Sequence, residues 1–323
     1  MQVESLKVEK PIEPAGQQKH PWRGYFLVAG ATLCWGAAAT VGKAIFAGHL
    51  FAGRPTISPL VITQTRTTFA VLILLAWLLL RHGRPFFRIT KRDLLLSVLI
   101  GTLGIAGSNY FYYVAIQKTT VPVAIILQYT SPVWVLLYML ARGLQRPTLA
   151  RISAVLLALI GTALVVELFH SGAGLNMQGV IAAQVAAFCF AFYIVVGQGL
   201  VSRNHQLRIM TYALLSAALM WLVIDPPWRL IAQNFSRGQW LFLFLFSCAS
   251  YLLPYILYFS GLKYLDPTGA VVTSSLEPVF ATLLSVTFLH EPIHGAQMLG
   301  FAAVLAATII VQRGHPAPSA SSN

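Results

Sequence analysis

Long apolar runs separated by short polar breaks fill most of the 323-residue chain. A helix needs about 20 apolar residues to cross a hydrocarbon layer about 30 Å thick, and runs of this length recur along the sequence. The runs lack the strict alternation of membrane β-strands. The pattern therefore predicts an all-α polytopic membrane protein with ten transmembrane helices, at residues 24–46, 59–80, 94–117, 120–141, 149–168, 178–200, 208–224, 239–262, 267–289 and 294–312.

The composition explains why these runs belong in lipid. Hydrophobic residues make up 57% of the chain and charged residues only 10%, whereas about a quarter of the residues of a soluble globular protein are charged. A soluble chain must cover its surface with polar groups, and this chain has too few of them. Residues 1–22 and 313–323 are polar and are expected to be cytoplasmic tails, the first of them disordered and without a cleavable signal.

The basic residues are distributed unevenly between the two sides of the predicted bundle. The N-terminal segment and alternate loops carry 16 Lys and Arg residues, and the opposite loops carry four. By the positive-inside rule, this bias predicts that both termini lie in the cytoplasm. The net charge of +13 then reflects topology and contact with anionic lipid. No basic domain interleaved with aromatic residues indicates a nucleic-acid partner.

The sequence contains an internal repeat. With an offset of 146 residues, Pro132–Val133 aligns with Pro278–Val279, and with an offset of 155 residues, Cys34–Trp35 aligns with Cys189–Phe190. Each copy would hold five spans, and because five is odd, the second copy must enter the membrane inverted. An inverted repeat is typical of transporters that work by alternating access. The alternative is that duplication merely enlarged a membrane scaffold. The two copies are expected at residues 23–168 and 178–312.

Two segments at matching places in the copies carry a family resemblance. They read NYFYYVAIQKTTVPVAIILQYTSP at Asn109–Pro132 and YILYFSGLKYLDPTGAVVTSSLEP at Tyr255–Pro278, and VFATLLSVTFLHEP follows the second. Together with Trp35–Gly36, they resemble the two EamA repeats of the drug/metabolite transporter superfamily, over about residues 24–312. The resemblance implies a ten-helix inner-membrane carrier, commonly an exporter of amino acids or other small metabolites. It also implies a cavity lined by spans one, three, four, six, eight and nine.

One departure from the family pattern is visible. The segment Leu144–Pro147 has no Glu where the family often has one after the fourth span, whereas the second copy keeps Glu291. A symmetric role for that acid therefore does not follow from the resemblance.

Three charged side chains inside the predicted spans are costly to bury and are candidates for function. Glu277, near the middle of the ninth span, is a candidate for proton or cation coupling or for binding a substrate ammonium group; a structural ion pair or hydrogen-bonded acid is the alternative. Its repeat counterpart is Ser131. Arg66 in the second span can bind a substrate carboxylate, or it can lock onto a helix end or a carboxylate. Lys43 can bind a carboxylate or extend to the outer interface.

Polar and aromatic residues on the other spans are candidates to line a substrate cavity, because polar atoms in lipid need partners and turn inward. Such a cavity would suit amino acids or amphipathic aromatic molecules, and helix packing is the alternative for each residue. The candidates are Trp35, Asn109, Tyr112, Tyr113, Gln128, Ser131, Trp134, Tyr193, Tyr251, Tyr255 and Ser274.

Three prolines inside the spans, Pro132, Pro254 and Pro278, are candidates for helix kinks or gates. A proline has no backbone N–H and leaves the carbonyl four residues earlier without its helical partner. Pro254 would free the carbonyl of Ser250, and Pro278 that of Ser274. Pro122 and Pro267, in contrast, are expected to begin helices.

The function that these features favour is transport. The sequence has no HExxH, GxSxG or Walker motif, so neither an enzyme nor an ATP-driven pump is expected. Cys34, Cys189 and Cys248 have no metal-ligand spacing, and no metal or other cofactor is expected. We expect a secondary active transporter, with protons as a candidate coupling ion. The alternatives are a passive channel or a receptor that moves no solute. The substrate, the direction of transport and the oligomeric state stay open.

Overall fold

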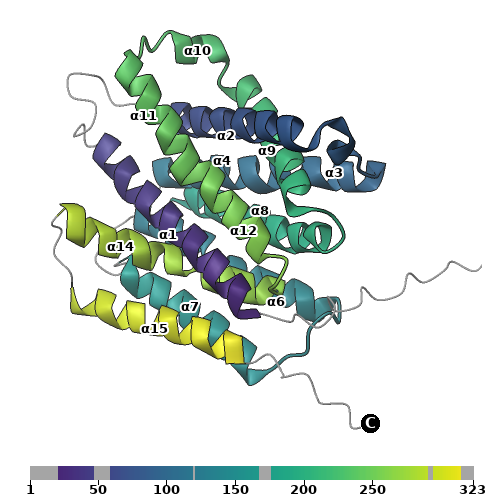
Figure 1. Cartoon of the computed structure of the whole chain (residues 1–323). Coiled ribbons are helices and arrows are strands. Elements are labelled where there is room, and N and C mark those ends of the chain that lie inside the picture. Colours follow the sequence, from purple (N-terminus) through teal and green to yellow (C-terminus); the bar gives the residue numbers. More distant parts are fainter. Residues whose placement is uncertain (1–20, 47–58, 119–120, 167–175, 290–293, 314–323) are drawn as a thin grey trace, which may run out of the picture.

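The computed structural model describes residues 21–46, 59–118, 121–166, 176–289 and 294–313. All regular elements in these ranges are helices (Figure 1). Of the expected tails at 1–22 and 313–323, residues 21, 22 and 313 are helical, while residues 1–20 and 314–323 lie outside the described residues, as does Glu291.

The helices follow the apolar runs of the sequence closely. Eight helical stretches are long and apolar enough to cross a membrane, and two further apolar helices, Leu149–Val165 and Gly295–Val311, are shorter. The unbroken helices are α1 (Pro21–Phe46), α2 (Pro59–His82), α7 (Leu149–Val165), α8 (Met177–Val201), α9 (Gln206–Ile224) and α15 (Gly295–Arg313). Short helices η1 (Arg84–Phe87) and α10 (Pro227–Ile231) lie in connections.

Two spans contain a π-helical segment in their middle. One consists of α3 (Lys91–Leu99), η2 (Ile100–Gly107) and α4 (Ser108–Lys118), and the other of α11 (Arg237–Ser247), η4 (Cys248–Leu252) and α12 (Leu253–Gly261). Shifting the first π-helix by 146 residues places it over the second. A π-helix inside an α-helix is uncommon and often marks a functional position, so the two copies share a local feature that hydropathy alone does not show.

Two other spans are broken next to a proline. The first consists of α5 (Val121–Gln128) and α6 (Ser131–Ala141), and the second of α13 (Pro267–Ser274) and α14 (Leu276–Leu289). Gln128 and Ser274, the last residues of α5 and α13, are separated by the same offset of 146. Pro132 and Pro278 lie just after these breaks, where each lacks the N–H that would continue the helix. Pro122 and Pro267 lie at the starts of α5 and α13, as the sequence predicted.

The two copies pack crosswise. Helix α2 of the first copy contacts α9 and η4 of the second copy, and α9 of the second copy contacts η2 of the first. The approach at η2 is close, because a Cβ atom on Gly101 would lie 2.0 Å from the carbonyl oxygen of Ala213 on α9. Each π-helix is therefore held by a helix of the other copy.

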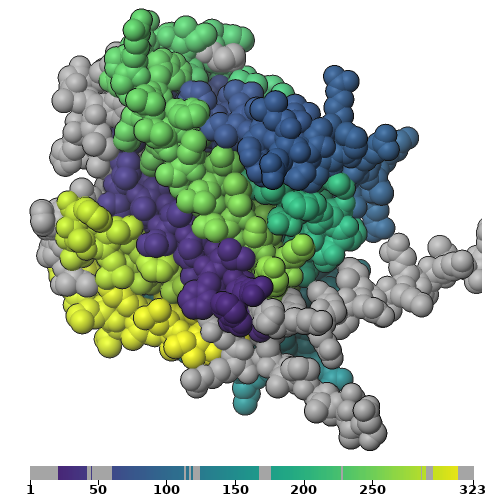
Figure 2. Space-filling model, viewed as in Figure 1, coloured from purple at the N-terminus to yellow at the C-terminus, as the bar shows by residue number. Residues whose placement is uncertain are grey.

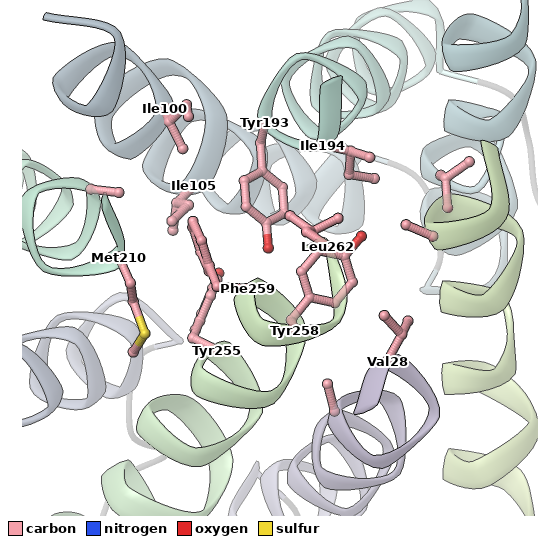
Figure 3. Close-up of a cluster of buried hydrophobic side chains, with 14 of the residues drawn as sticks. Val28, Ile100, Ile105, Tyr193, Ile194, Met210, Tyr255, Tyr258, Phe259 and Leu262 are labelled. Carbon is pink, nitrogen blue, oxygen red and sulfur yellow. The ribbon is translucent and has the colours of Figure 1, made fainter. Parts of the chain in front are cut away.

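The outer surface and the core differ as the bilayer requires. Large apolar side chains such as Phe26, Leu80 and Leu149 are exposed on the outside. On one face, α1 lies between the α11–α12 span and the α14–α15 region (Figure 2). The centre of the bundle contains aliphatic residues together with Tyr193 and Tyr258, whose rings face each other (Figure 3). The core therefore contains hydroxyl groups at membrane depth.

Candidate functional site

The candidate site begins where the two broken spans meet. The hydroxyl of Tyr129, which follows α5, donates a hydrogen bond to Oε2 of Glu277 in the first turn of α14, with an O···O distance of 2.9 Å. The carbonyl oxygen of Ser274, which Pro278 leaves without a helical partner, is a second acceptor at 3.3 Å. One phenol therefore connects the break in the first copy to the break in the second.

Helix α1 holds the backbone of α14 beside this contact. A Cβ atom on Gly36 would lie 2.8 Å from the backbone nitrogen of Ala281 and 3.1 Å from the carbonyl oxygen of Glu277. The hydroxyl of Thr40 also donates to the carbonyl oxygen of Ala281 at 3.2 Å. Only a residue without a side chain fits position 36 at this helix crossing. Gly36 thus allows a close backbone contact between α1 and the first turn of α14, which carries Glu277.

A cluster of aromatic rings adjoins the acid. Trp35 lies 5.5 Å from Tyr255 and 5.3 Å from Tyr258, measured between ring centroids, and Tyr193 lies 5.6 Å from Tyr258. The hydroxyl of Ser274 donates to that of Tyr258 at 3.3 Å, which ties the cluster to the break in the second copy. Figure 3 shows Tyr193, Tyr255 and Tyr258 converging between the helices. Their faces can pack against apolar or cationic groups, and their hydroxyls can form hydrogen bonds.

The side chain of Arg66 is bound to the π-helix η4. Its Nη2 atom donates to the carbonyl oxygen of Ser250 at 2.6 Å, which is the carbonyl that Pro254 leaves free. The guanidinium carbon lies 5.3 Å from the ring centroid of Tyr251, and the hydroxyl of Ser247 donates to the backbone oxygen of Arg66 at 2.6 Å. Arg66 of the first copy therefore binds a backbone carbonyl in the middle of the α11–α12 span of the second copy.

The first copy's break has its own polar neighbours on α8. The indole nitrogen of Trp134 and the hydroxyl of Thr130 each donate to Oε1 of Gln184 at 3.2 Å. The amide of Gln128 donates to the hydroxyl of Ser108 at 3.3 Å. Ser131 is fully buried, and its hydroxyl has no partner among the described residues. The break between α5 and α6 therefore has polar contacts both before it, at Gln128, and after it, at Thr130 and Trp134.

The remaining candidates lie elsewhere or outside the described part. The amide of Asn109 donates to the carbonyl oxygen of Ile105 in its own span at 2.7 Å. Tyr112 packs at the edge of a small cluster that includes Ala115 and Ala183. The side chains of Lys43 and Tyr113 lie outside the described residues. Among the described residues, no contact joins Asn109 to Glu277.

Tyr129, Gln184 and Tyr258 take part in the site but are not among the residues predicted to line the cavity. Their contacts join residues far apart in sequence, such as Tyr129 and Glu277, which are 148 positions apart. The one available signal was the repeat, because it aligns the two breaks with each other. Among the described residues, no group of three His, Cys, Asp or Glu side chains is placed to hold a metal ion.

Comparisons with known proteins agree with this architecture. A family model described as the EamA-like transporter family matches residues 22–167 and again residues 177–313. The threonine/homoserine exporter RhtA of Escherichia coli K12 is 26% identical over 275 residues, which cover 84% of this chain and 87% of that protein. An uncharacterized transporter of Archaeoglobus fulgidus is 29% identical over 284 residues, or 86% of this chain and 97% of that one.

A solved crystal structure also shares the fold. It covers 90% of this chain and 97% of its own, with a TM-score of 0.69 and 19% sequence identity. The apolar helices and the two family matches define a multi-pass membrane transporter rather than an enzyme. The chain belongs to the EamA-like transporter family, within the drug/metabolite transporter superfamily, as the resemblance in its sequence indicated.

Proposed function

We propose that this protein is a secondary active transporter that exports amino acids or other small metabolites across the inner membrane by alternating access. In this proposal, ten spans form two five-span copies of opposite orientation, and both termini face the cytoplasm. The finer points of this proposal rest on the repeat, on the charge bias and on the geometry of the site.

The observation that carries the proposal is the pair of matching breaks. The helices α5 and α13 end at equivalent positions of the two copies, and Tyr129 joins one break to Glu277 at the other. In transporters with inverted repeats, broken helices near the bilayer midplane form the binding site, and the repeats rock about it. A contact that connects both copies at such breaks is therefore expected to change when the bundle opens toward one side or the other.

The chemistry of the site favours a small substrate that carries an amino group. The carboxyl group of Glu277 can bind an ammonium group, and the cluster of Trp35, Tyr255 and Tyr258 offers aromatic faces for an apolar or cationic part of a substrate. The exporter RhtA, whose name gives threonine and homoserine as its substrates, is similar over most of its length. Amino acids with small side chains are therefore the first substrates to test.

Glu277 is also the proposed coupling residue. A carboxyl group at this depth is costly as an ion, and a bound proton or a bound cationic group removes that cost. Its single described side-chain donor, Tyr129, is neutral, so the hydrogen bond does not cancel the charge. A proton and a substrate ammonium group would then compete for the same carboxylate.

The test is a counterflow experiment with the full chain in liposomes, using threonine, homoserine and a panel of other amino acids, with and without an imposed pH gradient. We expect saturable counterflow, and loss of its dependence on the gradient in Glu277→Gln. A matched control is Gln128→Glu, which adds an acid at the other break. Flux without saturation or counterflow would indicate a channel, and binding without flux would indicate a receptor; either result contradicts the proposal. Full gradient dependence in Glu277→Gln would remove the coupling role.

A further inference from the structure

Two acidic side chains on one side of the bundle each bind residues of the opposite copy. This side, here called the terminal side, is the one where α1 begins and where the connection between α12 and α13 packs against Gly24. The first acid is Asp93, in the first turn of α3, and the second is Asp266, the N-cap of α13. Neither lies at the site formed by Glu277.

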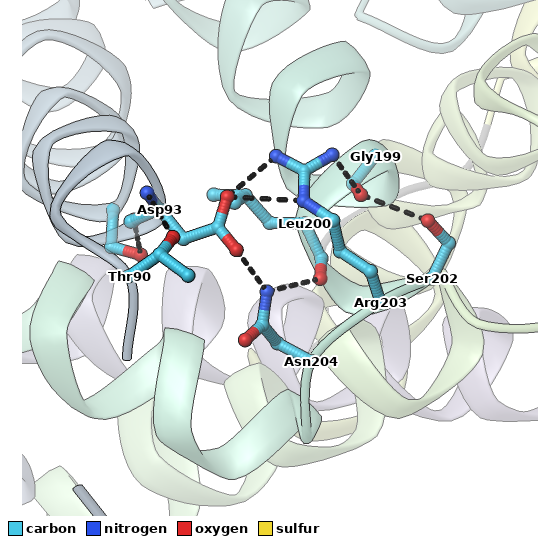
Figure 4. A network of polar contacts seen from close by, with 8 residues as sticks. Thr90, Asp93, Gly199, Leu200, Ser202, Arg203 and Asn204 are labelled. Atoms are coloured by element: carbon cyan, nitrogen blue, oxygen red, sulfur yellow. Dashed lines mark hydrogen bonds and ion pairs between the residues drawn. The ribbon is translucent and has the colours of Figure 1, made fainter. Parts of the chain in front are cut away.

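Asp93 accepts three hydrogen bonds from the connection that follows α8. Atoms Nε and Nη2 of Arg203 donate to Oδ1 at 3.0 and 2.7 Å, and the amide of Asn204 donates to Oδ2 at 2.8 Å (Figure 4). The same arginine donates to the carbonyl oxygen of Gly199 at the end of α8. The side chain of Asp93 is only 9% exposed. Charge-assisted bonds of this kind are the strong ones, so the contact ties α3 of the first copy to α8 of the second.

Asp266 makes the reciprocal contact, from the second copy to the first. Its Oδ2 atom accepts a hydrogen bond from the amide of Gln145 and lies 3.8 Å from a guanidinium nitrogen of Arg151. The hydroxyl of Thr268 donates to the oxygen of the same amide at 2.7 Å, so Gln145 is held at both of its polar atoms. Gln145 belongs to the segment that lacks the family's common Glu. A neutral amide there can donate to Asp266, whereas a carboxylate would repel it.

The equivalent positions on the opposite side of the bundle are used differently. With the offset of 146, Thr90 and Asp93 correspond to Ser236 and Gln239 at the start of α11. There the side chain of Gln239 accepts from the backbone N–H of Ser236 at 2.9 Å, which completes a capping box within one helix. The same position thus binds its own helix on one side and the other copy on the terminal side.

From these contacts we propose that Asp93 and Asp266 are two clamps that hold the terminal side closed, and that both must release when the protein opens toward that side. The inference rests on the proposed alternating access, because a closed side needs contacts that form in one state and break in the other. Each clamp has one partner from each copy, so rocking of the copies separates its partners. The side chain of Arg203 is about half exposed, so water can reach its guanidinium group when the two copies separate.

The test measures access to a reporter cysteine in the full chain, reconstituted in lipid nanodiscs. Ser97→Cys places a thiol of similar size one turn along α3 from Asp93, at a position that is fully buried. A hydrophilic maleimide reports opening, and the parent chain gives the background from Cys34, Cys189 and Cys248. The clamp variants are Asp93→Asn and Asp266→Asn. Asparagine preserves the side chain's shape and is also a good N-cap at position 266.

We expect each clamp variant to raise the labelling rate of the reporter by about tenfold, the usual scale of a coupling between two states. Asp225→Asn is the matched control, because Asp225 pairs with Arg229 four residues away within a single copy. The double variant Asp93→Arg with Arg203→Asp restores the pair in reverse and should restore slow labelling. A variant that merely misfolds would not be rescued in this way.

Unchanged labelling in both clamp variants, or an equal increase in Asp225→Asn, would overturn the inference. The readout needs no substrate and is therefore separate from the test of transport. Faster labelling of the clamp variants together with an absence of counterflow in the parent chain would uphold the clamps as closing contacts and reject the transport proposal. Counterflow in the parent chain without faster labelling of the clamp variants would uphold the transport proposal and reject the clamps.

Discussion

At the scale of single residues, the site depends on backbone carbonyls that prolines leave free. The sequence predicted that Pro254 would free the carbonyl of Ser250 and that Pro278 would free that of Ser274, because the rule is local. The structure supplies a donor for each of these two carbonyls, from Arg66 and from Tyr129. The donors could not be predicted, since they lie 184 and 145 positions away and only the packing of helices selects them.

The contact between Tyr129 and Glu277 can be tested with a minimal change. Tyr129→Phe removes the hydroxyl and leaves both acceptors without this donor, at a cost of about 1–3 kcal/mol in the free energy of unfolding. We expect a lower midpoint of thermal unfolding in nanodiscs and a changed KM in counterflow. Tyr138→Phe is the control, because Tyr138 lies on the same broken span and is 45% exposed. Equal effects of the two substitutions would contradict the role of Tyr129.

Arg66 can be tested in the same assays. Arg66→Lys keeps the positive charge but loses the planar group that binds Ser250 and faces Tyr251. If Arg66 mainly holds η4, the variant should lose about 1–3 kcal/mol of stability, with KM for substrates with and without a carboxylate changing alike. A selective rise in KM for substrates that carry a carboxylate, with stability unchanged, would instead assign Arg66 to the substrate.

At the scale of elements, the helices could be predicted better than their internal breaks. The thickness of the bilayer sets a minimum number of apolar residues for each span, and the hydropathy of the sequence shows these runs directly. The π-helices η2 and η4 are not visible in that pattern, because an extra residue in a helical turn changes neither composition nor length noticeably. Contacts such as that of Gly101 with α9 accompany them, and these contacts exist only in the folded bundle.

The crossing of α1 and α14 gives a prediction at this scale. Gly36→Ala introduces a Cβ atom against the backbone of Ala281 and should destabilise the protein by about 1–3 kcal/mol, as overpacking does. Gly199→Ala is the matched control, because a Cβ atom at that position of α8 meets no neighbouring atom within 4 Å. We expect the control to be neutral or stabilising by up to about 1 kcal/mol, since alanine favours the helix. The measurement is the midpoint of thermal unfolding of Gly36→Ala and of Gly199→Ala, and equal midpoints would contradict the close contact at Gly36.

At the scale of the whole molecule, the two copies are interlocked rather than side by side. Helix α2 reaches across to η4, and α9 reaches across to η2. The sequence could predict that there are two copies, but it could not predict this exchange of helices, because hydropathy does not specify which spans touch. The sequence candidates were charges at membrane depth, so Asp93 and Asp266, which lie at the ends of their helices, were not predicted.

The orientation of the bundle is a prediction for the whole molecule. The bias of Lys and Arg toward the terminal side should place both chain ends in the cytoplasm. A green fluorescent protein fused to the C-terminus should therefore fluoresce, and alkaline phosphatase at the same place should be inactive. Phosphatase fused into the connection at residues 47–58 should be active. An active phosphatase at the C-terminus would show that the orientation is reversed.

The position that holds Glu277 in one copy holds Ser131 in the other. A homodimer assembled from two identical single-copy chains could not have this arrangement, since it would present either a pair of acids or none. Joining the copies in one polypeptide allows them to diverge, so that one contributes the charge and the other contributes its hydrogen-bonding partner, Tyr129. Because the two copies belong to one chain, the protein can repeat a fold and still carry the acid in only one of the copies.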